Sequence, residues 1–155
     1  VSINDGLYYD NSDQIRLYGL NSSMEKSFQN LKFQLSYSFT KGESNSTELL
    51  EGISNHSMNI KTQYVIFKNM HLILASRYTS EKYVVLFGSG EKKKLDSYII
   101  SDLVVANKFS KINFKFGLKN LFNYLDNSRL DSESAEHLTS IDPGRRVYFN
   151  IGLAL

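Results

Sequence analysis

Two stretches near the C-terminus contain long alternations of apolar and polar residues, and they constrain the fold more than any other feature. The first runs from Lys111 to Asn123 and the second from Pro143 to Leu155. A period of two over about eight residues or more predicts β-strands with one apolar face and one polar face. A soluble domain seldom ends on such an alternation, whereas a membrane β-barrel commonly does. The apolar positions are Ile112, Phe114, Phe116 and Leu118, then Val147, Phe149, Ile151, Leu153 and Leu155.

The same alternation recurs upstream and predicts an all-β, antiparallel fold. The clearest case is the segment from Leu31 to Thr40, where apolar and polar residues alternate without a break. Barrel strands need only about ten residues to cross a bilayer, so a membrane protein of this class lacks any long apolar run. The other strands are predicted at 15–28, 56–67, 70–79 and 98–109, with the tail of a further strand at 1–9.

The connections between the predicted strands alternate in length. Outer-membrane barrels have tight turns on the periplasmic rim and long loops outside the cell. The pattern therefore favours a transmembrane β-barrel, with every short turn on the periplasmic side. Short turns are expected at 29–30, 68–69 and 110–111, and long polar loops near 41–55, 83–95 and 123–144.

The two faces of the strands differ in charge. An Arg or Lys that faces lipid near the bilayer midplane costs roughly 2–4 kcal/mol, so the charged face is expected to line a wet lumen. The face predicted to meet lipid carries Leu35, Thr62, Leu74, Val105, Phe116 and Ile151. The face predicted to meet the lumen carries Lys32, Lys61, Arg77, Lys115 and Lys119.

Aromatic residues gather near the strand ends, which is where interfacial anchors of membrane proteins lie. The outer girdle is predicted to comprise Tyr18, Phe39, Tyr78 and Tyr98. The inner girdle is predicted to comprise Phe28, Phe33, Phe67 and Phe109.

Composition excludes several classes of protein. The 155 residues include no cysteine, so a disulfide framework, a thiolate zinc site and a thiol nucleophile are all impossible. The formal net charge of +2 argues against nucleic acid as the main partner. The chain begins with valine and no signal peptide precedes it, which indicates a mature segment or a fragment.

Motifs that carry catalysis or metal binding are missing from the sequence. The histidines His56, His71 and His137 show neither HxH nor HExxH spacing, and no GxSxG motif accompanies the serines. We therefore expect no enzyme activity, no cofactor and no metal site. If the ligand were haem, His137 would be the candidate axial ligand. The run Lys92–Lys94 could meet lipopolysaccharide phosphates or an anionic ferric chelate, although a solvated loop tip is the default interpretation.

The segment Gly117–Asn127, followed by Pro143–Leu155, resembles the C-terminal end of TonB-dependent outer-membrane receptors. Weaker likenesses lie at Tyr98–Phe109, Arg16–Asn21 and Leu35–Glu43, so the resemblance spans essentially the whole chain. The residues at the positions of the family's Gly-x-x-Asn-Leu-Phe and Pro-Gly-Arg motifs are Gly117, Asn120, Leu121, Phe122, Pro143, Gly144 and Arg145.

These motif residues are expected to be structural. Gly117 and Gly152 should leave room on the lumen face for a bend or for a plug. Pro143–Gly144 should turn the chain into the last strand, and Asn120 should satisfy backbone groups of the loop at the outer end of its strand. One departure is Leu155, where the family usually has an aromatic residue. Either barrel assembly tolerates leucine there or the chain is clipped.

The resemblance implies a barrel of about twenty-two strands, plugged by an N-terminal domain. Residues 1–155 would supply the C-terminal part, about seven to eight strands, and the chain contains nothing that resembles a plug. The whole protein would be an outer-membrane receptor that takes up a scarce nutrient complex with TonB-supplied energy. A ferric siderophore is the commonest cargo of the family, and haem, cobalamin or a glycan is an alternative.

The same resemblance implies a set of partners. They are outer-membrane lipid and lipopolysaccharide, the plug domain, the TonB complex and a small-molecule nutrient chelate, with no nucleic acid. The residues predicted to face the lumen and to contact the plug or the cargo are Arg77, Lys115, Lys119, Tyr148 and Asn150.

Two other interpretations remain open from the sequence. A small, self-contained barrel of about eight strands would require Val1–Tyr9 to pair with Arg145–Leu155. A secreted β-sandwich that acts as a binding module would show similar alternation, but its two sheets would pack face to face.

Overall fold

The computed structural model describes residues 15–44, 52–85, 92–125 and 143–153. Within these ranges the chain forms only β-strands, turns and connecting segments. None of the described residues forms a helix that is long and apolar enough to cross a membrane. The strands are β1 (Ile15–Ser27), β2 (Leu31–Ser44), β3 (His56–Phe67), β4 (Met70–Thr79), β5 (Lys82–Val85), β6 (Lys92–Leu95), β7 (Tyr98–Phe109), β8 (Ile112–Lys119) and β9 (Arg146–Leu153).

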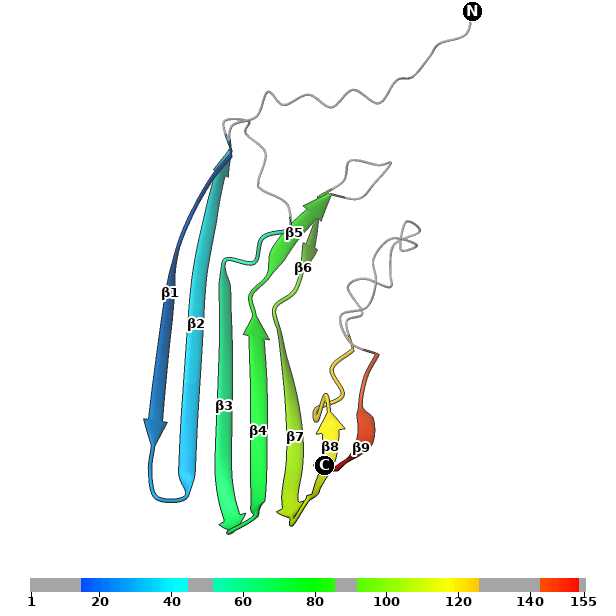
Figure 1. Ribbon diagram of the computed structural model, residues 1–155. Helices are drawn as coiled ribbons and strands as arrows, with labels where there is room; N and C mark the ends of the chain where they lie inside the picture. Colours follow the sequence, from blue (N-terminus) through cyan, green and yellow to red (C-terminus); the bar gives the residue numbers. More distant parts are fainter. Residues whose placement is uncertain (1–14, 45–51, 86–91, 126–142, 154–155) are drawn as a thin grey trace, which may run out of the picture.

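Seven of these strands form one antiparallel meander in the order β1-β2-β3-β4-β7-β8-β9 (Figure 1). In this meander each strand pairs with the next one along the chain, except that β4 pairs with β7. The two strands between them in sequence, β5 and β6, pair with each other as a hairpin and form a separate sheet. The three short turns lie at one end of the meander, as predicted. The strands β5 and β6 lie toward the opposite end.

The pairing register gathers most of the large apolar side chains on one face across the seven strands. Residues directly opposite one another in an antiparallel pair point to the same face of the sheet. The residues that lie opposite one another can therefore be followed from strand to strand as a row. One such row runs through Leu31, Tyr64, Leu72, Val105, Phe116 and Phe149.

The opposite face is polar and carries the residues predicted to line a lumen. Its rows include Gln34, Lys61, Ala75 and Asp102, and also His71, Ala106, Lys115 and Asn150. The six residues predicted to meet lipid all lie on the apolar face, and the five charged residues predicted to face away from it all lie on the polar face.

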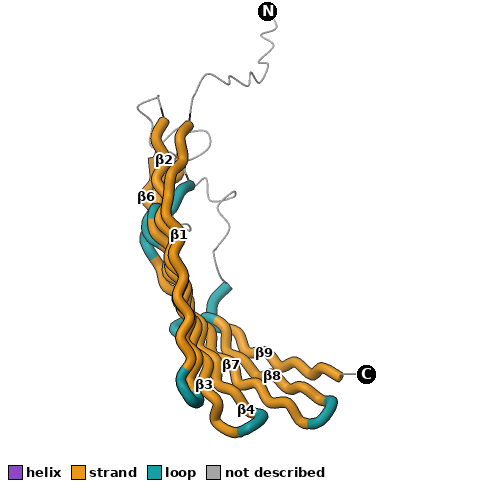
Figure 2. Tube along the Cα trace, turned by 60° about the vertical axis from the view of Figure 1, so that its left-hand side comes forward, coloured by secondary structure: helices purple, strands orange, loops and turns teal. Residues whose placement is uncertain are grey.

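A single layer of strands leaves this sheet without a hydrophobic core (Figure 2). Among the described residues, the only buried large apolar side chains are Leu95 and Ile100, and neither lies on the apolar face. That face instead exposes large side chains, such as Phe149 at 61% and Ile151 at 57%. No second sheet packs on the described strands, so the β-sandwich interpretation finds no counterpart there.

The described sheet is open and does not close into a barrel. β1 pairs only with β2, and β9 pairs only with β8. The small-barrel interpretation required pairing by Val1–Tyr9, and these residues lie outside the described ranges. The antiparallel all-β architecture is confirmed, whereas closure is not observed.

The structure corrects three details of the predicted elements. β2 continues to Ser44 because its last residues pair with the start of β1. β8 ends at Lys119, since Asn120 adopts a positive φ of 50° that no strand residue has. Tyr98 lies opposite Thr79 on the polar face, so it does not belong to the aromatic girdle of the apolar face.

The segment 83–95 was predicted to be an open loop, but parts of it form the hairpin of β5 and β6. The sequence signal was weak, because each strand has only four residues and β6 is mostly lysine. Strand pairing outweighs the poor β-propensity of lysine there.

Candidate functional site

The polar face gathers the five residues predicted to face the lumen. Lys115 lies between Ala106 and Asn150 in one row, and Tyr148 lies opposite Gly117 in the next. Lys119 pairs with Arg146, and Arg77 lies opposite Asn59. The structure thus places all five on one surface, while their roles toward plug or cargo stay predictions.

This surface carries a marked excess of positive charge over the seven strands. Its two carboxylates are both engaged. Glu25 lies 2.7 Å from Lys32 Nζ and accepts a hydrogen bond of 2.6 Å from Gln34, and Asp102 accepts one of 2.9 Å from the backbone N–H of Asn120. Such a surface favours anions. Its basic residues are Lys32, Lys61, Arg77, Lys108, Lys115, Lys119 and Arg146.

A different part of the same face is neutral and rich in hydroxyl and amide groups. Ser38 Oγ donates a hydrogen bond of 2.6 Å to Asn21 Oδ1. A shallow hollow of about 260 Å³ next to this pair is also lined by Ser23, Ser36 and Asn59. These groups can donate and accept hydrogen bonds, so this part of the face suits water or a neutral polar ligand.

The motif residue Asn120 organises the turn after β8. It is fully buried, at 0% exposure. Its Nδ2 donates to the carbonyl of Tyr124 at 2.8 Å, and its Oδ1 accepts from the backbone N–H of Tyr124 at 2.7 Å. The N–H of Leu121 donates to the carbonyl of Ser101 at 2.6 Å, which ties the turn to β7. The prediction that Asn120 satisfies backbone groups of the loop is confirmed.

The Pro-Gly-Arg motif is joined to this turn by Asn123. Asn123 Oδ1 accepts a hydrogen bond of 2.9 Å from the backbone N–H of Arg145. Gly144 has a φ of 95°, which other residues rarely adopt, and it packs closely against Asn123. The two halves of the family-like motif, which are separated in sequence by residues 126–142, therefore meet in space and set the start of β9.

Tyr148 covers Gly117 across the β8–β9 pair. A Cβ on Gly117 would collide with the Tyr148 ring, so only glycine allows the ring to lie there. Lys119 Nζ lies 5.7 Å from the centroid of the same ring, within cation–π range. The expectation that Gly117 leaves free space for a plug is therefore wrong, because Tyr148 fills that space.

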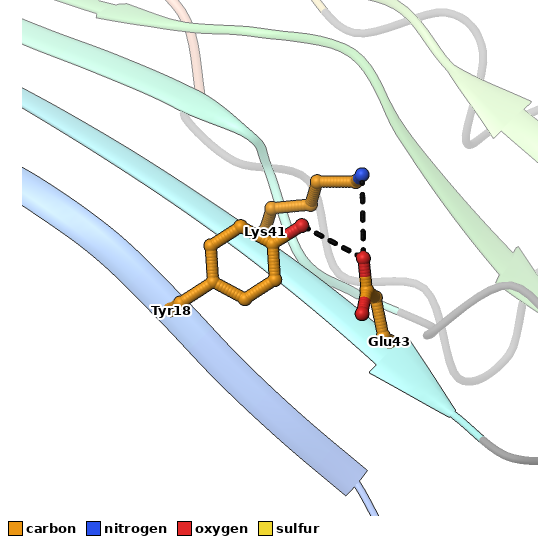
Figure 3. Close-up of polar contacts among 3 residues, drawn as sticks. All are labelled: Tyr18, Lys41 and Glu43. Atoms are coloured by element: carbon orange, nitrogen blue, oxygen red, sulfur yellow. Dashed lines mark hydrogen bonds and ion pairs between the residues drawn. The ribbon is translucent and has the colours of Figure 1, made fainter.

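A polar cluster marks the end of the apolar face that is remote from the short turns (Figure 3). Tyr18 donates a hydrogen bond of 2.8 Å to Glu43 Oε1, and Lys41 Nζ lies 3.5 Å from the same oxygen. Lys41 also lies 5.7 Å from the centre of the Tyr18 ring. The next residues toward the turns on this face are Phe39 and its row partner His56. The cluster therefore bounds the apolar surface at this end.

The other candidate residues show no arrangement suited to catalysis. His56 lies within 2.7 Å of the Tyr37 hydroxyl, and His71 within 3.2 Å of Gln63 Nε2. Across the described ranges, no group of three or more His, Asp or Glu residues could hold a metal ion. His137 lies outside these ranges.

The predicted phosphate-contacting run Lys92–Lys94 forms β6. Lys94 Nζ lies 2.9 Å from Glu81 Oε2, and this hydrogen-bonded carboxylate raises the pKa of the Lys94 ammonium group. Glu81 thus already neutralises one of the three lysines of this run.

Comparison with known proteins adds no relative. Neither the known protein families nor the curated proteins contain a match to this chain. Function must therefore be argued from the geometry of the sheet.

The Asn120 turn yields a stability prediction. Asn120→Ala should lower the free energy of unfolding by about 2–4 kcal/mol, because it removes both side-chain hydrogen bonds to the backbone of Tyr124 and forces alanine to a positive φ. Phe122→Ala is the control in the same turn. Phe122 is 69% exposed, so we expect a change of about 0.5 kcal/mol or less. Denaturant unfolding in detergent micelles measures both, and equal effects would contradict the assigned role of Asn120.

The contact between Gly117 and Tyr148 can be tested with a double-mutant cycle. Gly117→Ala should destabilise the native protein, because the new methyl group displaces the Tyr148 ring. In a Tyr148→Ala background the same change should be neutral or stabilising, giving a coupling energy of about 1–3 kcal/mol. Gly152→Ala is the control, since its Cβ would meet only Asn113 Cβ at 3.8 Å. Additive effects of the two substitutions would refute the contact.

Proposed function

We propose that this chain is part of the wall of an outer-membrane β-barrel. In this proposal the apolar face contacts lipid and the polar face lines an aqueous lumen. The whole protein would be a TonB-dependent receptor that takes up a scarce nutrient complex, a ferric siderophore being the leading cargo. The chain would be the C-terminal portion of that receptor, and a plug domain and the segment that engages the TonB complex would lie upstream.

One observation carries the membrane part of the proposal. The register aligns most of the large apolar residues of seven strands on one continuous face, and the described residues provide nothing to cover it. Exposed apolar patches of this extent are rare on monomeric soluble proteins. Each Phe, Leu or Ile transferred from water into an apolar environment contributes about 1.5–3 kcal/mol. Contact with hydrocarbon would convert this exposed face into the main source of stability.

The dimensions of the apolar face fit a bilayer. On β2 the face extends from Leu31 to Phe39, and Lys41 of the polar cluster follows. Nine strand residues at about 3.4 Å each, tilted by about 40°, span roughly 20–25 Å of membrane thickness. The apolar band of outer-membrane barrels is about 25 Å tall.

The stagger of the turns supports strand tilt. Leu31 is one residue away from the turn at 29–30, whereas Val105, in the same row, lies four residues before the end of β7 at Phe109. A progressive stagger of hydrogen-bonded rows relative to strand ends is what tilted strands of a barrel require. The open edges at β1 and β9 would then pair with other strands of the same barrel.

The receptor part of the proposal rests on the motif residues. The Gly-x-x-Asn-Leu-Phe and Pro-Gly-Arg segments, although far apart in the sequence, meet around Asn120, Asn123 and Gly144. This joint role gives a physical reason for the two segments to occur together, as they do in the family that the sequence resembles. The outer end of the barrel would then contact lipopolysaccharide.

The membrane orientation predicts an alternating pattern of lipid contact. Because the chain has no cysteine, single cysteines can be introduced and spin-labelled without background. In reconstituted full-length protein, labels at Leu74 and Val105 should collide with oxygen dissolved in lipid. Labels at Ala75 and Ala106, their neighbours on the polar face, should collide with a water-soluble nickel complex. Water access at all four positions would contradict the proposal.

The transport role predicts a growth phenotype. Deletion of the gene should abolish growth on the cognate ferric siderophore as the sole iron source, and loss of TonB energy should have the same effect. Radiolabelled uptake by intact cells measures transport directly. Unchanged uptake of ferric chelates, haem, cobalamin and glycans in the deletion strain would exclude a receptor for these cargoes. In that case the barrel wall could still be correct and the receptor assignment would be wrong.

A further inference from the structure

An open hollow of about 450 Å³ lies on the polar face, near the short-turn end of the sheet. It extends across β4, β7, β8 and β9. The hollow exists because two of its lining residues, Ala106 and Gly152, have little or no side chain to fill it. Ala106 lies opposite Lys115, and a Cβ on Gly152 would meet nothing closer than Asn113 Cβ at 3.8 Å. The polar side chains that line it are His71, Lys108, Asn113, Lys115 and Asn150.

Two adjacent rows bring these polar groups together. One row contains His71, Ala106, Lys115 and Asn150, and the next contains Lys108, Asn113 and Gly152. Neighbouring rows on one face are two residues apart along each strand, so all five side chains can reach a small ligand in the hollow. Two ammonium groups, two amides and an imidazole supply many donors and two positive charges.

No acid competes for the two lysines within the described part of the chain. The ion pairs found there involve Lys32, Lys41 and Lys94, and neither Lys108 nor Lys115 takes part. The two carboxylates of the polar face are engaged elsewhere, Glu25 on the distant strand β1 and Asp102 with the backbone of Asn120. Gln63 Nε2 lies 3.2 Å from His71 Nδ1; when it donates, the ring proton is on Nε2, and a neutral His71 remains a donor.

We propose that this hollow is a binding subsite for a small oxyanion, a carboxylate or phosphate group of a small molecule. The inference rests on the proposed function in one respect, because that function makes the polar face a lumen. It then adds the chemistry of the cargo, which would be anionic and would meet this subsite near the periplasmic end of its path. Both lysines are largely solvent-exposed, so binding is weak, with a dissociation constant on the order of 1 mM at low salt. Weak binding suits a site that must release its ligand.

Citrate and inorganic phosphate are the probes of the subsite. Saturation-transfer NMR measures the affinity of citrate for the full-length protein in nonionic detergent micelles at low salt, and ³¹P NMR measures that of phosphate. Lys108→Gln and Lys115→Gln should each weaken binding about threefold to fivefold, and the double variant about tenfold or more. The substitutions should weaken the binding of citrate and of phosphate alike, because the subsite recognises the oxyanion that the two probes share.

Lys119→Gln is the matched control. It removes the same charge from the same strand and face as Lys115→Gln, but Lys119 lies outside the hollow and over the Tyr148 ring. Its affinity for citrate should be unchanged. If Lys119→Gln weakened citrate binding as much as Lys115→Gln, the anion would be attracted by the overall positive charge of the face, and the proposed subsite would be wrong. Wild-type affinity in the Lys108→Gln/Lys115→Gln double variant would also contradict the subsite. Unfolding curves of each variant show that the fold is retained.

The two proposals fail separately. Absence of citrate binding together with alternating lipid contact of the spin labels would overturn the subsite and leave the barrel wall in place. Citrate binding without alternating lipid contact would overturn the membrane orientation and leave an oxyanion site on the sheet.

Discussion

The structure depends above all on the register of the antiparallel ladder. Because strand side chains alternate between faces, a slip of one residue in any pair would move an entire strand's apolar set to the polar side. No such slip occurs across the seven strands, even though a bulge interrupts the β3–β4 pair between Val65 and Phe67. The bulge lies next to the turn at 68–69, where only the last pair is affected. The concentration of large apolar side chains on one face, and of most charged residues on the other, follows from this register.

The register also creates an extended apolar face that the described residues leave exposed. Backbone groups within the sheet are paired, but the apolar face has no cover among the described residues, and both edge strands have an unpaired side. In water these features favour aggregation. In a closed barrel within a bilayer, neighbouring strands would pair with the edges and hydrocarbon would cover the apolar face. The proposed environment therefore resolves both problems together.

Local polar structure is concentrated where the ladder ends. The last strand lies far from β8 in sequence. Asn120 holds the turn after β8 through its bonds to Tyr124, and Asn123 Oδ1 joins that turn to the start of β9 by accepting from the N–H of Arg145. Tyr148 adds a contact within the β8–β9 pair by covering Gly117. The polar cluster of Tyr18, Lys41 and Glu43 ends the apolar face on β1 and β2. These contacts fix where strands and the apolar face end, whereas the pairing of the strands determines how the sheet is arranged.

The sequence by itself determined the seven strands, their short turns and the composition of each face, because a period of two is a local property that needs no tertiary information. It also indicated that Asn120 satisfies backbone groups of the loop, since an asparagine side chain can both donate and accept hydrogen bonds. Only the tertiary structure decided which residues become neighbours across strands. The cover of Gly117 by Tyr148, the place of Tyr98 on the polar face, the hairpin of β5 and β6, and the hollow between Lys108 and Lys115 all depend on pairing register. Register joins residues distant in the chain, and its energy comes from the sum of many pairs, so no single segment of the sequence reveals it.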